Sequence, residues 1–373
     1  MARFATGILA RLAIVAIAGA AAFSAAQSPP ASEPAAEQPA PAAAAAPPPP
    51  PVVDIALILP LEVPAYARAA EAVRAGFLAA AETVGIGAKT RVFGHGEDGV
   101  LAAFEAAQMA GARVIVGPLV RDDVKVVATM AIDLPWTIAL NQLEEGGAAP
   151  ANLYTFALSV DSDARLIAQR IRADTAPGTV PNVVVIGAET PLMKRFSAAF
   201  AAEWMAAGGS VPGLYAFEGT PTTMSAMRRD LARKAPDAAL LALDSGGAAL
   251  AKPYLGTVAT YASGLVFERE TAAVVRDLDG LTLTEIPWIV TPGAPQFAQL
   301  PKREFPSAAL TRLYALGLDA FRVAQAFRDG APERFTLDGA TGHVTLVEGR
   351  QFAREGRFAV FRAGQLTPVD GPR

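Results

Sequence analysis

The chain has 373 residues, a net charge of −4 at neutral pH and no cysteine. This length is enough for two ordinary domains with a large core, and the weak negative charge argues against a nucleic-acid partner. Without cysteine, disulfides, zinc–thiolate sites, thiol nucleophiles and a lipid anchor on a cysteine are excluded.

The N-terminus has the pattern of an export signal. Arg3 and Arg11 precede an apolar run at residues 12–23, and Ser24 and Ala26 have the small-residue spacing that a signal peptidase requires. We therefore expect a signal peptide over residues 1–26, cleaved after Ala26, and a periplasmic protein. An uncleaved anchor is the alternative, but the run is shorter than the ~20 apolar residues of a membrane span.

Residues 27–52 are mostly proline and alanine. Such a composition cannot bury a core and predicts a disordered, extended linker. The linker either lets the folded part reach away from a membrane or is a spacer without a function of its own.

A short apolar run at residues 53–60 predicts a strand that is buried on both faces. An amphipathic helix follows from about Ala65, with Val73 and Phe77 at helical spacing. A buried strand followed by such a helix is half of a βαβ unit, and the unit then recurs. Further strands are expected at residues 90–93, 113–116, 136–140 and 153–157, with helices at 100–110 and 122–132. The pattern predicts an α/β lobe with a mainly parallel sheet.

Residues 94–99, Gly-His-Gly-Glu-Asp-Gly, match the dinucleotide pattern G-x-G-x-x-G. That pattern belongs on the first βα turn, whereas here it lies on the second, and Glu97 and Asp98 would repel a pyrophosphate. We interpret it as a glycine-rich turn and expect no nucleotide cofactor.

A second α/β series begins with a helix that Asp161 can cap. Its strands are expected at residues 183–186, 211–217 and 238–243, and its helices at 191–207 and 224–234; a further strand is expected after it, at residues 286–290. A long apolar helix at residues 310–327 follows, then an antiparallel hairpin from residues 335–337 and 343–346 and a last strand at 358–361. We assign residues 53–158 and 286–334 to a first lobe, and 159–285 and 335–373 to a second.

This order of motifs resembles the type I periplasmic binding proteins and, more narrowly, the LppC family of penicillin-binding protein activators. The resemblance spans about residues 52–366. It is carried by the long helix and by Ile55–Leu61 with Gly76-Phe77-Leu78, Gly117-Pro118-Leu119, Leu140-Asn141-Gln142 and Ala157-Leu158-Ser159. It implies two lobes, each a mainly parallel sheet flanked by helices, joined by three strands around a cleft.

The resemblance also implies a role without catalysis, because family members are outer-membrane lipoproteins that stimulate class A penicillin-binding proteins in peptidoglycan synthesis. The chain departs from the family in two ways. It lacks the lipobox cysteine, and a proline- and alanine-rich tether stands in place of the N-terminal helical repeats.

Residues at the carboxyl ends of the strands are the candidates for a ligand cleft. They are Leu61, Gly117, Pro118, Leu119, Asn141 and Gln142 from the first lobe, and Ser159, Glu189, Asp244, Ser245 and Tyr261 from the second. A structural role is the alternative for each. The related amino-acid-binding proteins hold a carboxylate with hydroxyls and backbone amides in the first lobe, whereas the matching loops here offer proline, leucine and glycine.

Catalysis has little support. The two histidines, His95 and His343, are far apart in the sequence, and no H-E-x-x-H, G-x-S-x-G or P-loop occurs. The Asp244–Gly247 stretch reads as a turn, and the pairs Glu144-Glu145 and Glu268/Glu270 as solvated charges. We expect no enzyme activity, no metal and no cofactor.

The leading hypothesis is a penicillin-binding protein activator-like factor with a class A penicillin-binding protein as partner. The alternative is a periplasmic solute-binding protein for a small polar ligand, serving an ABC transporter or a sensor.

Overall fold

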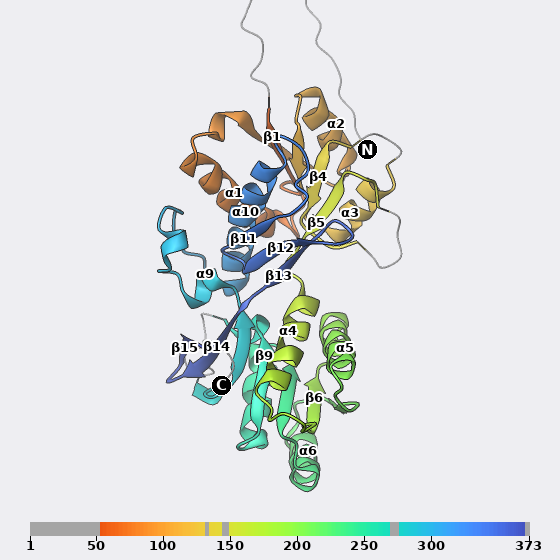
Figure 1. Cartoon of the computed structure of the whole chain (residues 1–373), viewed down its shortest axis with the longest axis vertical. Helices are drawn as coiled ribbons and strands as arrows, with labels where there is room; N and C mark the ends of the chain where they lie inside the picture. Colours follow the sequence, from red (N-terminus) through yellow and green to blue (C-terminus); the bar gives the residue numbers. More distant parts are fainter. Residues whose placement is uncertain (1–52, 131–133, 144–148, 269–275, 370–373) are drawn as a thin grey trace, which may run out of the picture. The chain divides into compact units, whose positions relative to one another are not determined.

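The described part of the chain forms two sheets, each covered by helices (Figure 1). The structure, a computed structural model, describes residues 53–130, 134–143, 149–268 and 276–369. The expected signal peptide (1–26) and linker (27–52) lie outside the described residues. Within the described ranges, no helix is both long and apolar enough to cross a membrane.

The first lobe is built on an eight-stranded sheet with the order β11-β12-β13-β5-β4-β3-β1-β2. Neighbours from β2 to β13 run parallel, and β11, β12 and β13 are antiparallel to one another. The strands are β1 (Ile55–Leu59), β2 (Thr90–Gly94), β3 (Val114–Val116), β4 (Trp136–Ala139), β5 (Leu153–Phe156), β11 (Thr336–Asp338), β12 (His343–Val347) and β13 (Gln351–Glu355). The helices are α1 (Ala67–Thr83), α2 (Leu101–Met109), α3 (Arg121–Ala128) and α10 (Ala308–Ala326), with a 3-10 turn η1 (Gly87–Lys89).

The first strand confirms the predicted burial on both faces. Successive side chains of a strand point to opposite faces, so Ile55, Leu57 and Leu59 join the core under α1 and α10. Ala56 and Ile58 join the core under α2 and α3. All five side chains are fully buried, which makes β1 the centre of the first lobe.

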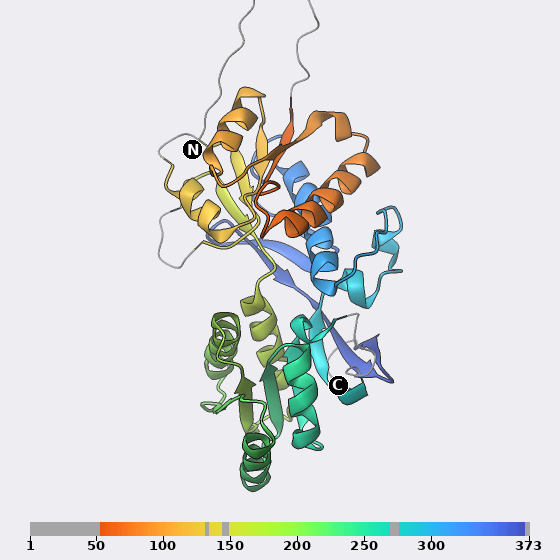
Figure 2. The ribbon, with the colours of Figure 1, turned by 180° about the vertical axis from the view of Figure 1, so that it is seen from behind.

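Helices α1 and α10 pack closely side by side, as both ribbon views show (Figures 1 and 2). Each contributes a glycine to the contact. A Cβ added at Gly76 would lie 2.0 Å from the carbonyl oxygen of Tyr314, and one at Gly317 would lie 2.1 Å from that of Val73. Any larger side chain at either position would therefore push the helices apart.

The second lobe has a seven-stranded sheet with the order β15-β14-β10-β9-β8-β6-β7. The strands are β6 (Val183–Gly187), β7 (Gly213–Ala216), β8 (Ala238–Ala242), β9 (Ala259–Ser263), β10 (Thr282–Glu285), β14 (Arg357–Arg362) and β15 (Gln365–Pro368). The helices are α4 (Val160–Ala173), α5 (Pro191–Ala206), α6 (Pro221–Lys234) and α7 (Ser245–Ala251), with 3-10 turns η2 (Lys252–Leu255) and η3 (Gly264–Val266). The short helix α9 (Pro287–Val290) and the 3-10 turn η4 (Pro295–Phe297) belong to the first lobe, because Trp288 and Phe297 pack into its core. The five strands from β7 to β10 are parallel, and β14 and β15 close the edge in antiparallel fashion.

The chain passes between the two sheets three times: from β5 to α4, from β10 to α9, and from β13 directly to β14. The assignment of residues 335–373 to the second lobe was therefore wrong for the part up to Glu355. The predicted hairpin, β11 and β12, is present, but it joins the first sheet through β13. The reason is that Phe352 of β13 pairs with Phe156 of β5 and packs into the first core, with ring centroids 6.1 Å apart.

The segment expected as a strand at residues 286–290 is a second correction. The strand is β10, which ends at Glu285, and Pro287 begins the short helix α9. Proline favours the first position of a helix because its fixed φ suits the helix and its missing N–H is not needed there.

A third correction concerns the cap of helix α4. The Ser159 side chain caps this helix by accepting a hydrogen bond from the Asp161 N–H, whereas Asp161 was the expected cap.

Position 117 requires glycine because its backbone lies very close to β1. Its φ is +108°, and an added Cβ would lie 2.2 Å from the carbonyl oxygen of Ile58. Its N–H donates to the Ile138 carbonyl at 2.8 Å, and the next residue, Pro118, accepts from the Leu140 N–H at 2.9 Å. The Gly117 amide is thus used inside the sheet.

We expect Gly117→Ala to be more destabilising than Gly99→Ala. Gly99 has a similar φ of +96° but has no atom near an added Cβ. Both variants lose about 1–2 kcal/mol for the left-handed backbone, and only Gly117→Ala adds a steric cost of about 1–3 kcal/mol. Urea unfolding of the two variants measures the difference, and an equal loss of unfolding free energy in both would contradict this packing.

Candidate functional site

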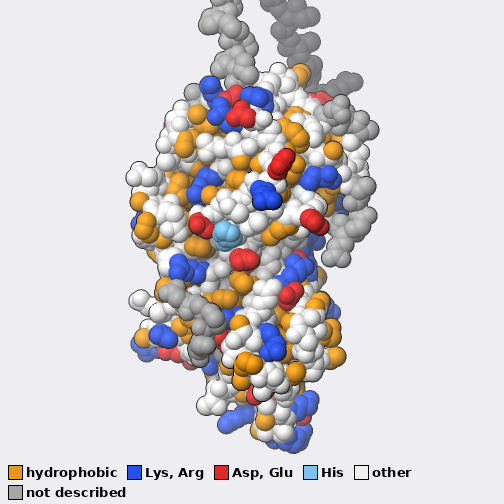
Figure 3. Space-filling model, viewed as in Figure 1, with side chains coloured by type: hydrophobic (Ala, Val, Ile, Leu, Met, Phe, Trp, Pro, Cys, Tyr) orange, Lys and Arg blue, Asp and Glu red, His pale blue; other side chains and the backbone are white. Residues whose placement is uncertain are grey.

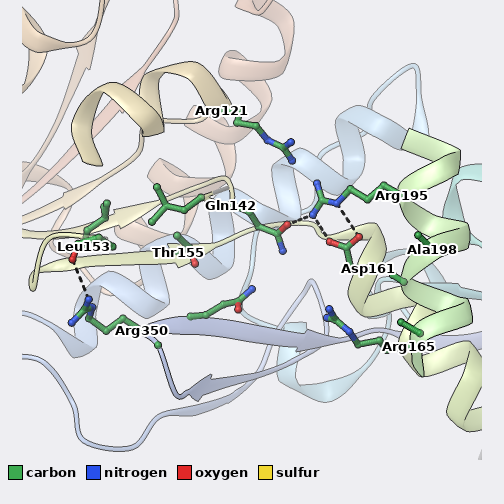
Figure 4. A pocket seen from close by; sticks show the side chains of 15 residues that line it. Arg121, Gln142, Leu153, Thr155, Asp161, Arg165, Arg195, Ala198 and Arg350 are labelled. Atoms are coloured by element: carbon green, nitrogen blue, oxygen red, sulfur yellow. Dashed lines mark hydrogen bonds and ion pairs between the residues drawn. The ribbon is translucent and has the colours of Figure 1, made fainter. Parts of the chain in front are cut away.

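A cavity of 1030 Å³ is bounded by residues of both lobes (Figure 4). The first lobe supplies the start of α3, the residues after β4, strand β5 and the β12–β13 turn, and the second lobe supplies α4 and α5. The lining residues are Arg121, Gln142, Leu143, Ala149, Leu153, Thr155, Asp161, Arg165, Arg195, Ala198, Ala199, Ala202, Gly349, Arg350 and Gln351.

Helix periodicity explains how α4 and α5 contribute their side chains. Ser159 caps α4, which places Asp161 in the first turn and Arg165 four residues later on the same face. Thr190 caps α5 ahead of Pro191. The α5 residues that face the cavity follow helical spacing, namely Arg195, Ala198, Ala199 and Ala202.

The charge of the cavity wall is strongly positive. Four of its described residues are arginines, and Asp161 is the one acid among them. Arg195 is neutralised by that acid: its Nε donates to Asp161 Oδ1 at 2.9 Å, and its Nη2 donates to Asp161 Oδ2. The same Nη2 donates to Gln142 Oε1 of the first lobe. Arg195 thus joins the two lobes at the cavity.

The other three arginines have few partners. Neither the Arg121 nor the Arg165 side chain has a hydrogen bond or ion pair within the described ranges. Arg350 donates from Nη2 to the Ala149 carbonyl at 3.3 Å, and its buried Nε has no partner among the described residues. The cavity therefore holds positive charge that the described residues do not neutralise.

Buried charge pairs link the lobes beside the cavity. Arg312 of α10 donates to Glu285 at the end of β10, with Nη2 and Oε2 2.6 Å apart, and also to the Gly264 carbonyl at 2.6 Å. Arg354 of β13 donates to Asp163 Oδ1 of α4 at 2.9 Å. Burial raises the pKa of the Asp163 carboxyl, although Arg354 acts in the opposite direction.

Asp319 of α10 holds the β11–β12 turn in place. Its carboxylate accepts the N–H groups of Ala340 and Thr341 at 2.9 and 2.7 Å, and the Thr341 hydroxyl at 2.7 Å. The Thr341 carbonyl in turn accepts from Arg354 at 3.0 Å. Burial raises the pKa of the Asp319 carboxyl.

Of the eleven ligand candidates from the sequence, only Gln142 lines this cavity. Asn141 supports the loops, because its amide donates to the Leu119 carbonyl at 2.9 Å. Leu119 is buried, and Leu61 packs against the first core. Gly117 and Pro118 are bonded within the sheet, as described above. Ligand contact by these residues stays a prediction.

The second-lobe candidates have different local roles. Asp244 caps α7 by accepting the Gly247 N–H at 2.8 Å, and Ser245 is the first residue of that helix. Glu189 forms an exposed ion pair with Lys194 at 2.7 Å. Tyr261 lines a separate cavity of 570 Å³ near the start of β8 and β9. Sequence reasoning missed Arg121, Arg165, Arg195 and Arg350, since an arginine on a helix or turn reads as a solvated charge.

The histidines and acidic residues do not gather. His95 Nε2 lies 3.5 Å from Asp123, and His343 lies on β12 with its Nδ1 2.7 Å from Asp338. In the part of the chain that the structure describes, no group of three or more histidines and acidic residues could hold a metal ion.

Residues 49–220 and 217–364 match the family model described as "LppC putative lipoprotein". The chain belongs to the LppC family. It is 26% identical over 332 residues to "Penicillin-binding protein activator LpoA" from Pantoea ananatis, which covers 76% of this chain and 48% of that protein. The relative of that name from Klebsiella pneumoniae is 26% identical over 312 residues, covering 70% of this chain and 42% of its own length. The LppC chain thus spans about half the length of the curated relatives it matches.

Two solved structures confirm the predicted two-lobed, type I periplasmic binding protein-like fold. The first, "LpoA (YraM) C-domain from Haemophilus influenzae, a regulator of PBP1A", has a TM-score of 0.72 and 22% identity and covers 85% of this chain and 100% of that one. The second, described as a "putative branched-chain amino acid ABC transporter" from Chromobacterium violaceum, has a TM-score of 0.71 and 31% identity. It covers 83% of this LppC chain and 99% of that one.

The raised pKa of Asp163 has a consequence for the pH dependence of stability. A group whose folded-state pKa lies above its unfolded value stabilises the fold below the unfolded pKa, about 3.9, and loses that contribution as pH rises through the folded pKa. We therefore expect the wild type to lose unfolding free energy relative to Asp163→Asn as the pH rises above about 4.

Chemical unfolding at a series of pH values measures this difference. The control is Asp122→Asn, at an exposed carboxylate, which should stay within about 0.5 kcal/mol of the wild type throughout. A wild type that gains stability over Asp163→Asn across the same pH range would show that Arg354, and not burial, dominates at this site.

Proposed function

We propose that this LppC chain is a non-enzymatic factor that activates a class A penicillin-binding protein in peptidoglycan synthesis. The observation that carries the proposal is the extent of the family match, which runs through residues 49–364 and so includes both lobes and the contacts between them. The curated relatives are named penicillin-binding protein activators, and the Haemophilus protein is described as a regulator of PBP1A.

The proposed site of action is the periplasm. The export pattern of residues 1–26, with cleavage after Ala26, supports this location, and residues 27–52 would then act as a tether. Because the chain has no cysteine, attachment through a cysteine-linked lipid has no residue to use.

A specific observation favours a second candidate. The Chromobacterium protein, described as part of a branched-chain amino acid ABC transporter, is 31% identical over nearly its whole chain. A periplasmic solute-binding protein for a small polar ligand, serving such a transporter or a sensor, would use the same two-lobed fold. The partner protein distinguishes the two candidates: a cell-wall synthase for the first, a permease or sensor for the second.

The test is the effect of the purified protein on a class A penicillin-binding protein from the same cell. Glycan polymerisation and peptide cross-linking are followed with and without the protein, and the heat-unfolded protein is the control. We expect faster synthesis and co-purification of the two proteins, because the family match covers both lobes. An unchanged synthesis rate, together with no co-purification of the correctly folded protein, would overturn the proposal.

A further inference from the structure

We propose that the cavity between the lobes binds a short peptide that carries two or more free carboxylates. The arginines that would hold it are Arg121, Arg165 and Arg350, which come from three separate elements. Figure 4 shows Arg121 and Arg165 extending into the cavity from opposite sides. The preference for carboxylates is argued from the residues of the cavity. The source of the peptide, peptidoglycan, rests on the proposed function.

The first argument is the excess of positive charge over negative charge that the described wall residues carry. Among the described residues of the wall, four guanidinium groups face one carboxylate, that of Asp161, which leaves three positive charges. Asp161 is already paired with Arg195. Like charges that converge on one cavity repel each other, and a bound anion removes this repulsion. Guanidinium groups bind carboxylates through two parallel hydrogen bonds, which also fixes the orientation of the anion.

The second argument is the backbone at Arg350. This residue has a φ of +60°, directly after Gly349 with a φ of +79°. Glycine adopts this conformation easily, whereas a long side chain does so at a cost. The Arg350 carbonyl accepts the Thr155 N–H at 3.1 Å, which holds the turn over β5. An arginine in a conformation that favours glycine, with a buried Nε that has no partner among the described residues, points to a role beyond packing.

The third argument is the rest of the wall, which selects a peptide over a simple phosphate. Ala198, Ala199 and Ala202 form one face of α5, and Leu143 adds further apolar surface. Thr155 and Gln351 add uncharged hydrogen-bonding groups to the wall. A peptide of small residues would complement this wall, because its small apolar side chains can pack on the alanines and its amides can form hydrogen bonds with the uncharged polar groups. The stem peptides of peptidoglycan have this composition, with alanine methyl groups and free carboxylates.

The experiment is a calorimetric titration of the purified protein with a disaccharide tetrapeptide from peptidoglycan. Two further probes are the same molecule with its carboxylates amidated, and inorganic pyrophosphate. We expect binding of the free acid, a loss of about tenfold or more in affinity on amidation, and weaker binding as salt rises. Preferential binding of pyrophosphate, or equal binding of the acid and the amide, would overturn the assignment.

Single substitutions locate the site. Arg165→Gln and Arg121→Gln should each weaken binding by about tenfold, because each removes a charge-assisted contact from the carboxylates. Arg165 is exposed on α4, so its loss should leave folding intact. The matched control is Arg229→Gln on α6, in the basic end of the second lobe outside the cavity, which should stay within about twofold (Figure 3). Binding that is unaffected by both cavity variants would place the ligand elsewhere and contradict the proposal.

Stimulation of the synthase, measured in parallel, separates this inference from the proposed function. Stimulation without binding of the tetrapeptide overturns the peptide site and leaves the activator role intact. Binding that depends on Arg165, without stimulation, supports the carboxylate site and counts against the activator role.

Discussion

The buried ion pair between Arg312 and Glu285 is the interaction on which the arrangement of the lobes depends. Arg312 lies on α10, which fills the core of the first lobe, whereas Glu285 ends β10 in the sheet of the second. Their side chains are 11% and 1% exposed, so removing either partner leaves an uncompensated charge in the interior, at a cost of about 3–5 kcal/mol. Arg312 also binds the carbonyls of Gly264 and Phe267, which satisfies more of its donors. This directional network fixes one orientation in a way that apolar packing alone would not.

The cavity is a consequence of that orientation. Arg354 and Asp163 form a second, partly buried pair across the lobes, and Arg195 bonds to Gln142 in the cavity wall. With the two sheets held at these points, α5 faces the β12–β13 turn across a gap that the alanines of α5 do not fill. The arginines are then placed around this space by elements far apart in the sequence.

Much of the fold could be predicted from local patterns. The wholly apolar β1 and the long apolar stripe of α10 predict burial directly, and both are confirmed. The strand β10 could not be predicted in the same way, since Thr282, Thr284 and Glu285 are polar and are buried only because Arg312 and neighbouring strands surround them. Strand β13 was missed because only Phe352 and Arg354 of its side chains are buried.

The cavity was missed for a related reason. The rules for strand ends identify the loops after β1 and β3, whereas the arginines of the cavity lie mainly on helix faces and at a hairpin turn. Only the tertiary arrangement brings them together.

The most direct test of this account is the distribution of distances between the lobes in solution. Because the chain has no cysteine, spin labels can be attached through Val126→Cys on α3 and Met205→Cys on α5, both at exposed positions. Pulsed electron–electron double resonance then measures the distances between the two spin labels. The account predicts one narrow distribution, which broadens when Arg312→Leu is added, because the buried pair is what holds the lobes in place. A broad distribution or two populations in the labelled protein with Arg312 intact would contradict it.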